Sequence, residues 1–205
     1  MRPFAGLRML DVGCGAGLLS EPLARLGAKV TGIDPAADVL RVARRRAVDQ
    51  ELEIDYRQTT VEALAANGSR FDLVCALEVV EHVPDPDAFL ATCVRLVRPG
   101  GALVLSTLNR TARAFALGIV AAEYVLGWLP RGTHSWRRFR RPSEVARPLR
   151  RAGAEVVDVT GTVYDPLRDR FVLSSDLQVN YMLFAALPPE GRDPAFRPAV
   201  PERSG

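Results

Sequence analysis

Lysine, paired cysteines and long apolar runs are all scarce in this chain of 205 residues. Lys29 is the only lysine among 27 basic residues, so the positive charge is arginine, which crowds between residues 131 and 151. The three cysteines stand apart without a C-x-x-C pair. This spacing argues against a disulfide framework and a thiolate metal site, and it predicts small buried residues.

No apolar run reaches the roughly 20 residues that are needed to span a bilayer. The first residues do not read as a signal peptide, so we expect a cytoplasmic protein. At this length one domain with a full core is the default. We expect that domain to cover residues 1–187, and residues 188–205, rich in proline, arginine and glutamate, to be a disordered tail.

Strand-like and helix-like segments alternate along the chain. Strands are expected near residues 7–10, 29–33, 52–56, 71–76 and 102–107, with helices between them. This order is typical of an α/β fold with a doubly wound, Rossmann-like sheet that is mostly parallel. A helix at 86–97 closed by the turn at 98–101, a helix at 143–152, a strand at 154–160 and a last, antiparallel strand at 179–187 are also expected.

Residues 11–17, Asp-Val-Gly-Cys-Gly-Ala-Gly, are the most informative motif. They lie between the first strand and the first helix, where glycines let the backbone approach a ligand closely. The spacing of Gly13, Gly15 and Gly17 differs from the G-x-G-x-x-G of most dinucleotide folds, and Asp11 would repel a phosphate. S-adenosylmethionine carries an ammonium and a sulfonium and no phosphate. The motif therefore predicts an S-adenosylmethionine site.

Further cofactor contacts are expected around this loop and at the ends of later strands. Asp34 ends the second strand, where a carboxylate can accept hydrogen bonds from both ribose hydroxyls; the alternative is that it caps the next helix. The Thr60 hydroxyl and the Val61 amide could read an adenine edge, although an N-cap at Thr60 explains that residue equally well. Cys14 in the loop and Leu77 after the fourth strand complete the predicted set.

Glu78, Glu81 and His82 form the candidate catalytic segment. If they occupy a helical turn, their offsets of three and four place them on one face beside the cofactor. Two carboxylates and an imidazole can hold a divalent cation such as Mg²⁺, which lowers the pKa of a bound phenolic hydroxyl. Alternatively His82 alone is the general base, or the segment is only a structural turn.

Residues 110–142 form an insertion that the basic fold does not require. Its first half is apolar from Phe115 to Trp128, and five arginines follow between residues 131 and 141, interleaved with Trp136 and Phe139. This pattern is typical of a helix on an anionic membrane surface and predicts a peripheral location at the inner face of the membrane. A lid over the substrate pocket is the alternative. No nucleic-acid module accompanies the arginines, so nucleic acid is not an expected partner.

Through these motifs and several longer segments, the chain resembles the ubiquinone-biosynthesis O-methyltransferases from residue 6 to about residue 187. The more specific segments are Ser-Thr-Leu-Asn-Arg at 106–110, Ala-Glu-Tyr at 122–124, Pro-Arg-Gly-Thr-His at 130–134 and Val-Asn-Tyr-Met-Leu at 179–183. The resemblance implies methylation by S-adenosylmethionine of a catechol hydroxyl on a prenylated ubiquinone precursor. It also implies a divalent ion at Glu78, Glu81 and His82, and lipid contact through residues 112–132.

The likeness has one departure. Members of the family carry a helical segment ahead of the first strand, whereas Gly6 and Leu7 stand almost at that strand here, so the start is either truncated or the pocket closes differently. Two rival functions follow from the sequence. One is a non-catalytic, membrane-associated scaffold of a quinone-biosynthesis complex. The other is a nicotinamide-dependent oxidoreductase, which the loop spacing and Asp11 disfavour.

Overall fold

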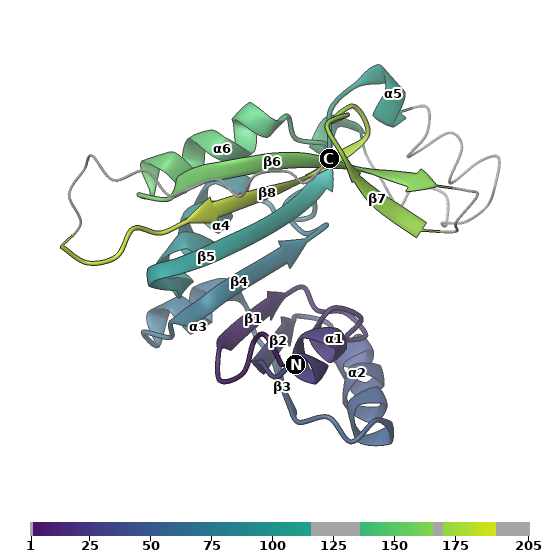
Figure 1. Cartoon of the computed structure of the whole chain (residues 1–205), viewed down its shortest axis with the longest axis vertical. Coiled ribbons are helices and arrows are strands. Elements are labelled where there is room, and N and C mark those ends of the chain that lie inside the picture. The colour runs from purple at the N-terminus through teal and green to yellow at the C-terminus, as the bar shows by residue number, and fades with distance from the viewer. Residues whose placement is uncertain (1, 116–135, 166–169, 192–205) are drawn as a thin grey trace.

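The computed structural model describes residues 2–115, 136–165 and 170–191. Its central feature is an eight-stranded sheet in the order β3-β2-β1-β4-β5-β8-β6-β7, which Figure 1 shows from β3 at one edge to β7 at the other. The parallel strands are β1 (Arg8–Val12), β2 (Lys29–Asp34), β3 (Ile54–Gln58), β4 (Phe71–Leu77) and β5 (Val97–Leu108). Antiparallel pairing joins β8 (Asn180–Ala186) to β5, β6 (Glu155–Asp165) to β8, and β7 (Arg170–Ser174) to β6.

This topology confirms the predicted fold class, a doubly wound sheet that is mostly parallel and becomes antiparallel toward its C-terminal end. The chain runs outward from β1 to β3 and then returns to place β4 beside β1. That reversal is the switch point of the sheet, and ligands of such folds bind beyond the carboxyl ends of the strands there. The glycine loop follows β1, so the topology brings it to this edge.

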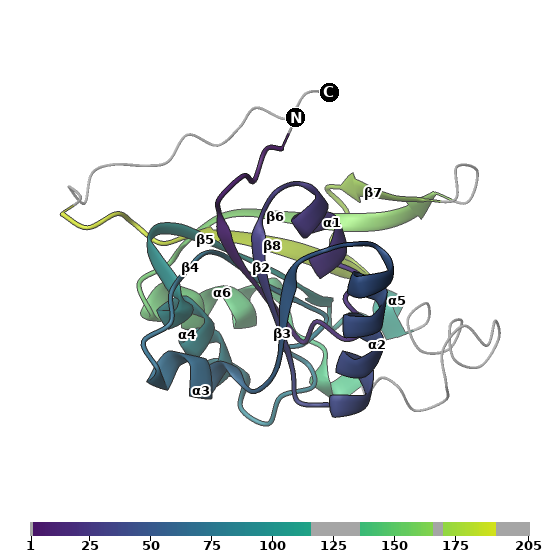
Figure 2. The same cartoon turned by 90° about the horizontal axis from the view of Figure 1, so that it is seen from below.

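Helices cover the sheet on both faces (Figures 1 and 2). The helices α1 (Ser20–Arg25) and α2 (Ala37–Asp49) pack against β1, β2 and β3 on one face. On the other face lie α3 (Val61–Ala66), α4 (Pro86–Leu96) and α6 (Pro142–Arg151). Two short elements, α5 (Ala112–Ala114) and η2 (Trp136–Arg138), lie within the insertion near its two ends.

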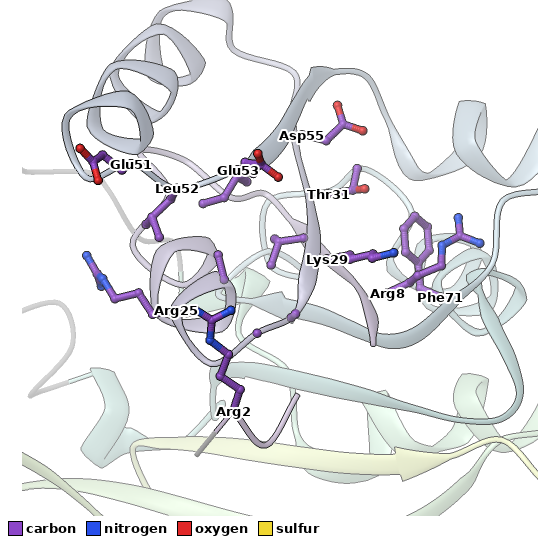
Figure 3. A pocket seen from close by; sticks show the side chains of 15 residues that line it. Arg2, Arg8, Arg25, Lys29, Thr31, Glu51, Leu52, Glu53, Asp55 and Phe71 are labelled. Atoms are coloured by element: carbon purple, nitrogen blue, oxygen red, sulfur yellow. The ribbon is translucent and has the colours of Figure 1, made fainter. Parts of the chain in front are cut away.

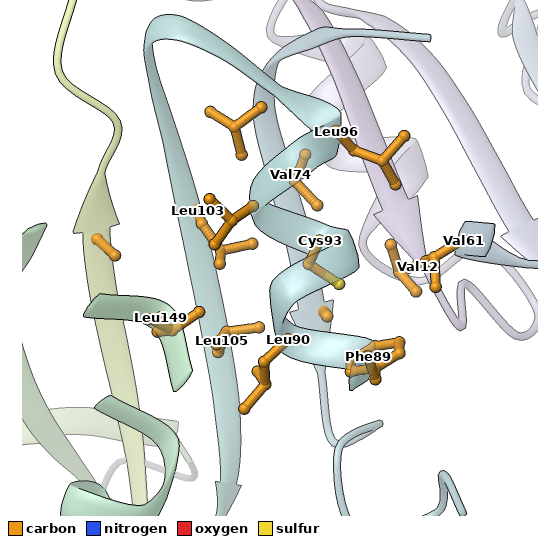
Figure 4. Close-up of a cluster of buried hydrophobic side chains, with 14 of the residues drawn as sticks. Val12, Val61, Val74, Phe89, Leu90, Cys93, Leu96, Leu103, Leu105 and Leu149 are labelled. Carbon is orange, nitrogen blue, oxygen red and sulfur yellow. The ribbon is translucent and has the colours of Figure 1, made fainter. Parts of the chain in front are cut away.

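The largest apolar cluster lies under α4 (Figure 4). Leu90, Cys93 and Leu96 face β4 and β5, and each is at most 1% exposed. Full burial of a leucine side chain contributes about 2 kcal/mol, so this face fixes α4 on the sheet. All three cysteines are free and buried, as their spacing predicts.

Three expectations about elements need correction. The third strand begins two residues later than its apolar pattern indicates, because Tyr56 pairs with Gly32 in the sheet. Residues 98–101 are part of β5 and not a helix-ending turn, because the Gly100 amide donates to the Leu187 carbonyl at 2.9 Å. Strand β7 was not expected; a hairpin with β6 defines it.

Residues 116–135, which include nearly all of the apolar half of the insertion, lie outside the described residues, and so does most of the expected tail, residues 192–205. The predicted apolar helix and Arg131 therefore fall beyond what the structure describes. At the two ends of that gap, Phe115 and Trp136 are exposed by 45% and 41%. Within the described ranges, no helix combines the length and the apolar character needed to cross a bilayer.

Candidate active site

A cavity of about 630 Å³ opens beyond the carboxyl ends of β1, β2 and β4. The structure brings six of the predicted site residues to its wall, and these are Gly13, Asp34, Thr60, Val61, Glu78 and His82. Glu81, in the turn after β4, does not line it. The other predicted residues lie in the loop or at the strand ends without lining the cavity, and these are Asp11, Cys14, Gly15, Gly17 and Leu77. Their contacts with a cofactor stay predictions.

The glycines of the loop are required by backbone conformation. Gly13, Gly15 and Gly17 have φ angles of +66°, +52° and +86°, in the left-handed region that side chains disfavour. Gly17 also faces Tyr56, because a Cβ atom there would lie 2.2 Å from the tyrosine hydroxyl oxygen. Tyr56 on β3 therefore supports the loop from below, a role that the sequence pattern did not predict. The signal was present, since Tyr56 is the one buried side chain of its strand.

Asp34 ties the end of β2 to the glycine loop. Its Oδ2 accepts a hydrogen bond from the Gly15 amide at 3.1 Å, and its Oδ1 accepts one from the Ala36 amide at 2.9 Å. Helix α2 begins without a side-chain cap, so the alternative of Asp34 as a helix cap is wrong. The carboxylate lines the cavity at the place where the sequence predicts a ribose contact.

Asp11 lies beneath the loop and not in the cavity. It is 3% exposed, and its Oδ2 accepts a hydrogen bond from the Ser20 hydroxyl at 2.6 Å. Burial raises the pKa of Asp11 to about 6, against the opposing effect of the Ser20 hydrogen bond. Asp11 therefore joins the loop to the start of α1 and adds negative charge close to the cavity.

Thr60 caps helix α3, since its hydroxyl accepts a hydrogen bond from the Ala63 amide at 3.4 Å. The N-cap alternative is thus confirmed. Thr60 and Val61 also line the cavity, so an adenine contact stays a prediction.

Glu78 is held in a strained conformation at the end of β4. Its φ is +56°, which is uncommon for a residue with a side chain. The Glu78 amide donates to the carbonyl and hydroxyl oxygens of Ser106 at 3.0 and 3.2 Å, and the Ser106 hydroxyl donates to Glu78 Oε1 at 2.8 Å. Ser106 on β5 therefore orients Glu78 at the cavity wall. The sequence pattern predicted no role for Ser106, although this residue begins a family-like segment.

The described residues do not confirm the predicted metal cluster, and its expected geometry needs correction. Residues 78–82 form a bend and a turn, not a helical turn. Glu81 is 3% exposed and accepts a hydrogen bond from the Thr107 hydroxyl at 2.9 Å, whereas Glu78 and His82 are exposed. In the described part of the chain, no three side chains of the metal-ligating types are grouped to hold an ion. The divalent cation at these residues therefore stays a prediction.

The charge of the cavity wall selects among ligands. Four carboxylates line it, from Asp34, Glu62, Glu78 and Asp85, together with the His82 imidazole and no arginine or lysine among the described residues. A pyrophosphate would meet only negative charge there, whereas a sulfonium and an ammonium would be stabilised. The wall therefore favours S-adenosylmethionine over a nicotinamide dinucleotide.

A wider hollow, of about 1030 Å³, lies at the opposite ends of β1 and β2 (Figure 3). Basic side chains, among them Arg8 and Lys29, and acidic ones, among them Glu53 and Asp55, share its wall. It contains none of the predicted site residues, so the chemistry is expected at the carboxyl edge.

Comparison with known proteins defines the class. Residues 10–105 match the family described as Methyltransferase domain. A solved S-adenosylmethionine-dependent methyltransferase from Methanosarcina mazei has a TM-score of 0.67 at 20% identity, covering 90% of this chain and 93% of that one. Magnesium protoporphyrin IX methyltransferase from Synechocystis PCC 6803, with bound SAH, has a TM-score of 0.64 at 22% identity, covering 90% and 75%. Identity this low shows the shared fold alone. Together with the domain match and the relatives below, it defines an S-adenosylmethionine-dependent methyltransferase.

Curated relatives define the family. The ubiquinone biosynthesis O-methyltransferase of Methylobacterium sp. (strain 4-46) is 55% identical over 186 residues, which are 91% of this chain and 75% of the relative. The enzyme of the same name from Methylocella silvestris is 56% identical over 185 residues, or 90% and 72% of the two chains. This chain belongs to the ubiquinone biosynthesis O-methyltransferases. It catalyses S-adenosylmethionine-dependent O-methylation in that pathway.

Proposed function

We propose that the chain methylates a catechol hydroxyl of a polyprenylated ubiquinone precursor, either demethylubiquinol or a polyprenyl dihydroxyphenol or dihydroxybenzoate. The observation that carries the proposal is the cavity wall, where Asp34 and Glu78 provide negative charge and His82 provides a base. The carboxylates favour a cationic methyl donor. An imidazole is the side chain that most often acts as a general base, and it is suited to take a phenolic proton.

In this mechanism His82 removes the proton from the catechol hydroxyl. The oxygen forms a bond to the methyl carbon in line with the sulfur, the carbon–sulfur bond breaks, and its electron pair stays on sulfur as the sulfonium becomes a neutral thioether. Glu78, fixed by Ser106, lines the same wall and stabilises the positive charge that His82 gains. Holding oxygen and methyl in attack geometry supplies much of the rate enhancement.

A methyl-transfer assay with labelled S-adenosylmethionine and a short-chain prenylated catechol tests this assignment. We expect His82→Gln to lower kcat by about 10² to 10⁴ and to leave the affinity for S-adenosylmethionine nearly unchanged. Arg45→Gln, an exposed change on α2, is the control and should retain full activity. Retained turnover in His82→Gln, or complete loss of wild-type turnover in a chelator that leaves the fold intact, would contradict a reaction driven by His82 alone.

We also propose that the enzyme works as a peripheral protein on anionic membranes. An isoprenoid tail stays in the bilayer, so the cavity must reach the membrane surface. The apolar segment predicted between Phe115 and Trp128 provides burial, and each nearby arginine adds about 1 kcal/mol at an anionic surface.

Vesicle flotation tests the membrane proposal. Binding should require anionic lipid, weaken at high salt, and diminish when Phe115, Leu126 and Trp128 are changed to serine. If the wild-type chain ignores anionic vesicles while it turns over a short-chain catechol, the insertion is a lid and the membrane proposal fails.

A further inference from the structure

A small arginine-lined cavity lies between α4 and α6, outside the cofactor site. Its volume is about 170 Å³. The basic side chains on its wall are Arg140, which precedes α6, and Arg147 and Arg151, which are one turn apart on that helix. Val80, from the turn between Glu78 and Glu81, also lines it.

These three guanidinium groups lack protein partners in the described part of the chain. Arg140 Nε is buried there without a hydrogen-bond partner. Across residues 2–115, 136–165 and 170–191, no ion pair includes Arg140, Arg147 or Arg151. A buried donor without an acceptor is unfavourable, and buried polar groups in native proteins are nearly always satisfied by protein, water or ligand.

Two carboxylates face the arginines, and one of them is already engaged. Glu144 forms an ion pair with Arg110 and accepts a hydrogen bond from the Arg141 amide at 3.0 Å. Asp87 lies in the exposed first turn of α4. Among the described residues, no ion pair includes Asp87. Three guanidinium groups therefore face only one carboxylate that is not already paired, and the cavity has an excess of positive charge.

We propose that this cavity binds a phosphate-type oxyanion through Arg140, Arg147 and Arg151. A tetrahedral oxyanion presents several acceptors to planar guanidinium groups, and such charge-assisted hydrogen bonds are among the strongest in proteins. The oxyanion is either free phosphate or the phosphate of a lipid headgroup. Because Val80 joins the cavity to the catalytic turn, an occupied cavity restrains the segment that carries Glu78 and His82.

Binding of inorganic phosphate to the full chain tests this site without any methyl transfer. Thermal unfolding is followed in phosphate and in chloride at equal ionic strength. We expect phosphate to raise the Tm of the wild type, and Arg147→Gln/Arg151→Gln to weaken phosphate binding by about tenfold or more. The matched control is Arg45→Gln/Arg150→Gln, which removes the same charge from exposed positions outside the cavity and should respond like the wild type.

A second arm separates the two sources of phosphate. Flotation compares vesicles of phosphatidylcholine with vesicles that also contain phosphatidic acid. If only the phosphatidic acid vesicles distinguish Arg147→Gln/Arg151→Gln from its control, the site holds a headgroup; if soluble phosphate distinguishes them, it holds the free ion. If the two double variants behave alike in both arms, the proposal is overturned.

Discussion

Because the glycine loop contacts β3 closely, we expect Gly17→Ala to lower the free energy of unfolding by an amount that can be worked out from the structure. The new Cβ would lie 2.2 Å from Tyr56 Oη and 3.1 Å from its Cζ. The ring has little room to retreat, because it is 6% exposed and packs so closely on Gly32 that a Cβ atom there would lie only 2.7 Å from it. The substitution must therefore displace either the loop or the strand.

Gly15→Ala separates backbone strain from this clash. Gly15 also has a positive φ, of +52°, but no atom lies within 4 Å of the position that a Cβ would take there. Gly15→Ala should cost about 1–2 kcal/mol of unfolding free energy for the left-handed backbone. Gly17→Ala adds overpacking of about 1–3 kcal/mol, so we expect a total loss of roughly 2–5 kcal/mol.

Urea unfolding without cofactor measures these losses, and Tyr56→Phe completes a double-mutant cycle. Tyr56 Oη is buried with no hydrogen-bond partner among the described residues, so its removal alone should be nearly neutral. In the Gly17→Ala background the same removal should restore about 1–2 kcal/mol, because the closest clashing atom is gone. Equal losses in Gly15→Ala and Gly17→Ala, or an additive double variant, would refute the reasoning.

Three further predictions concern charge and orientation. The folded state binds the Asp11 proton more tightly than the unfolded chain, because its pKa is raised from 3.8 to about 6. This stabilisation is complete below about pH 4 and is lost as the pH rises through about 6, so Asp11→Asn should remove up to about 3 kcal/mol of pH-dependent unfolding free energy across that window. Ser106→Ala removes the hydroxyl that holds Glu78, so kcat should fall about tenfold. The affinity for S-adenosylmethionine should be unchanged in calorimetry, and Ser106→Thr should restore part of the activity. Arg46→Ala should lower the free energy of unfolding in urea more than Arg45→Ala does, because it removes the main partner of the buried Glu21 carboxylate; equal losses in the two variants would contradict that role.

Local sequence determined the architecture and the edge of the sheet at which the cofactor site is predicted. Strands and helices each bury one face, so the spacing of apolar residues predicts their order along the chain. Gly13, Gly15 and Gly17 predicted a tight loop after the first strand, because only glycine adopts a left-handed backbone conformation at little cost. Asp34 could be placed because parallel strands end at one edge of the sheet.

Tertiary structure decided what each side chain near that edge does. Asp11 points beneath the loop to Ser20, and Glu81 turns to Thr107 on the neighbouring strand, because pairing of β4 with β5 buries that carboxylate. The spacing of the catalytic segment could not reveal this, since Thr107 is 26 residues away in sequence. Tyr56 reaches the glycine loop across β2 for the same reason. Residues distant in sequence meet only when the sheet forms, and these contacts determine which acids line the cavity and which support it.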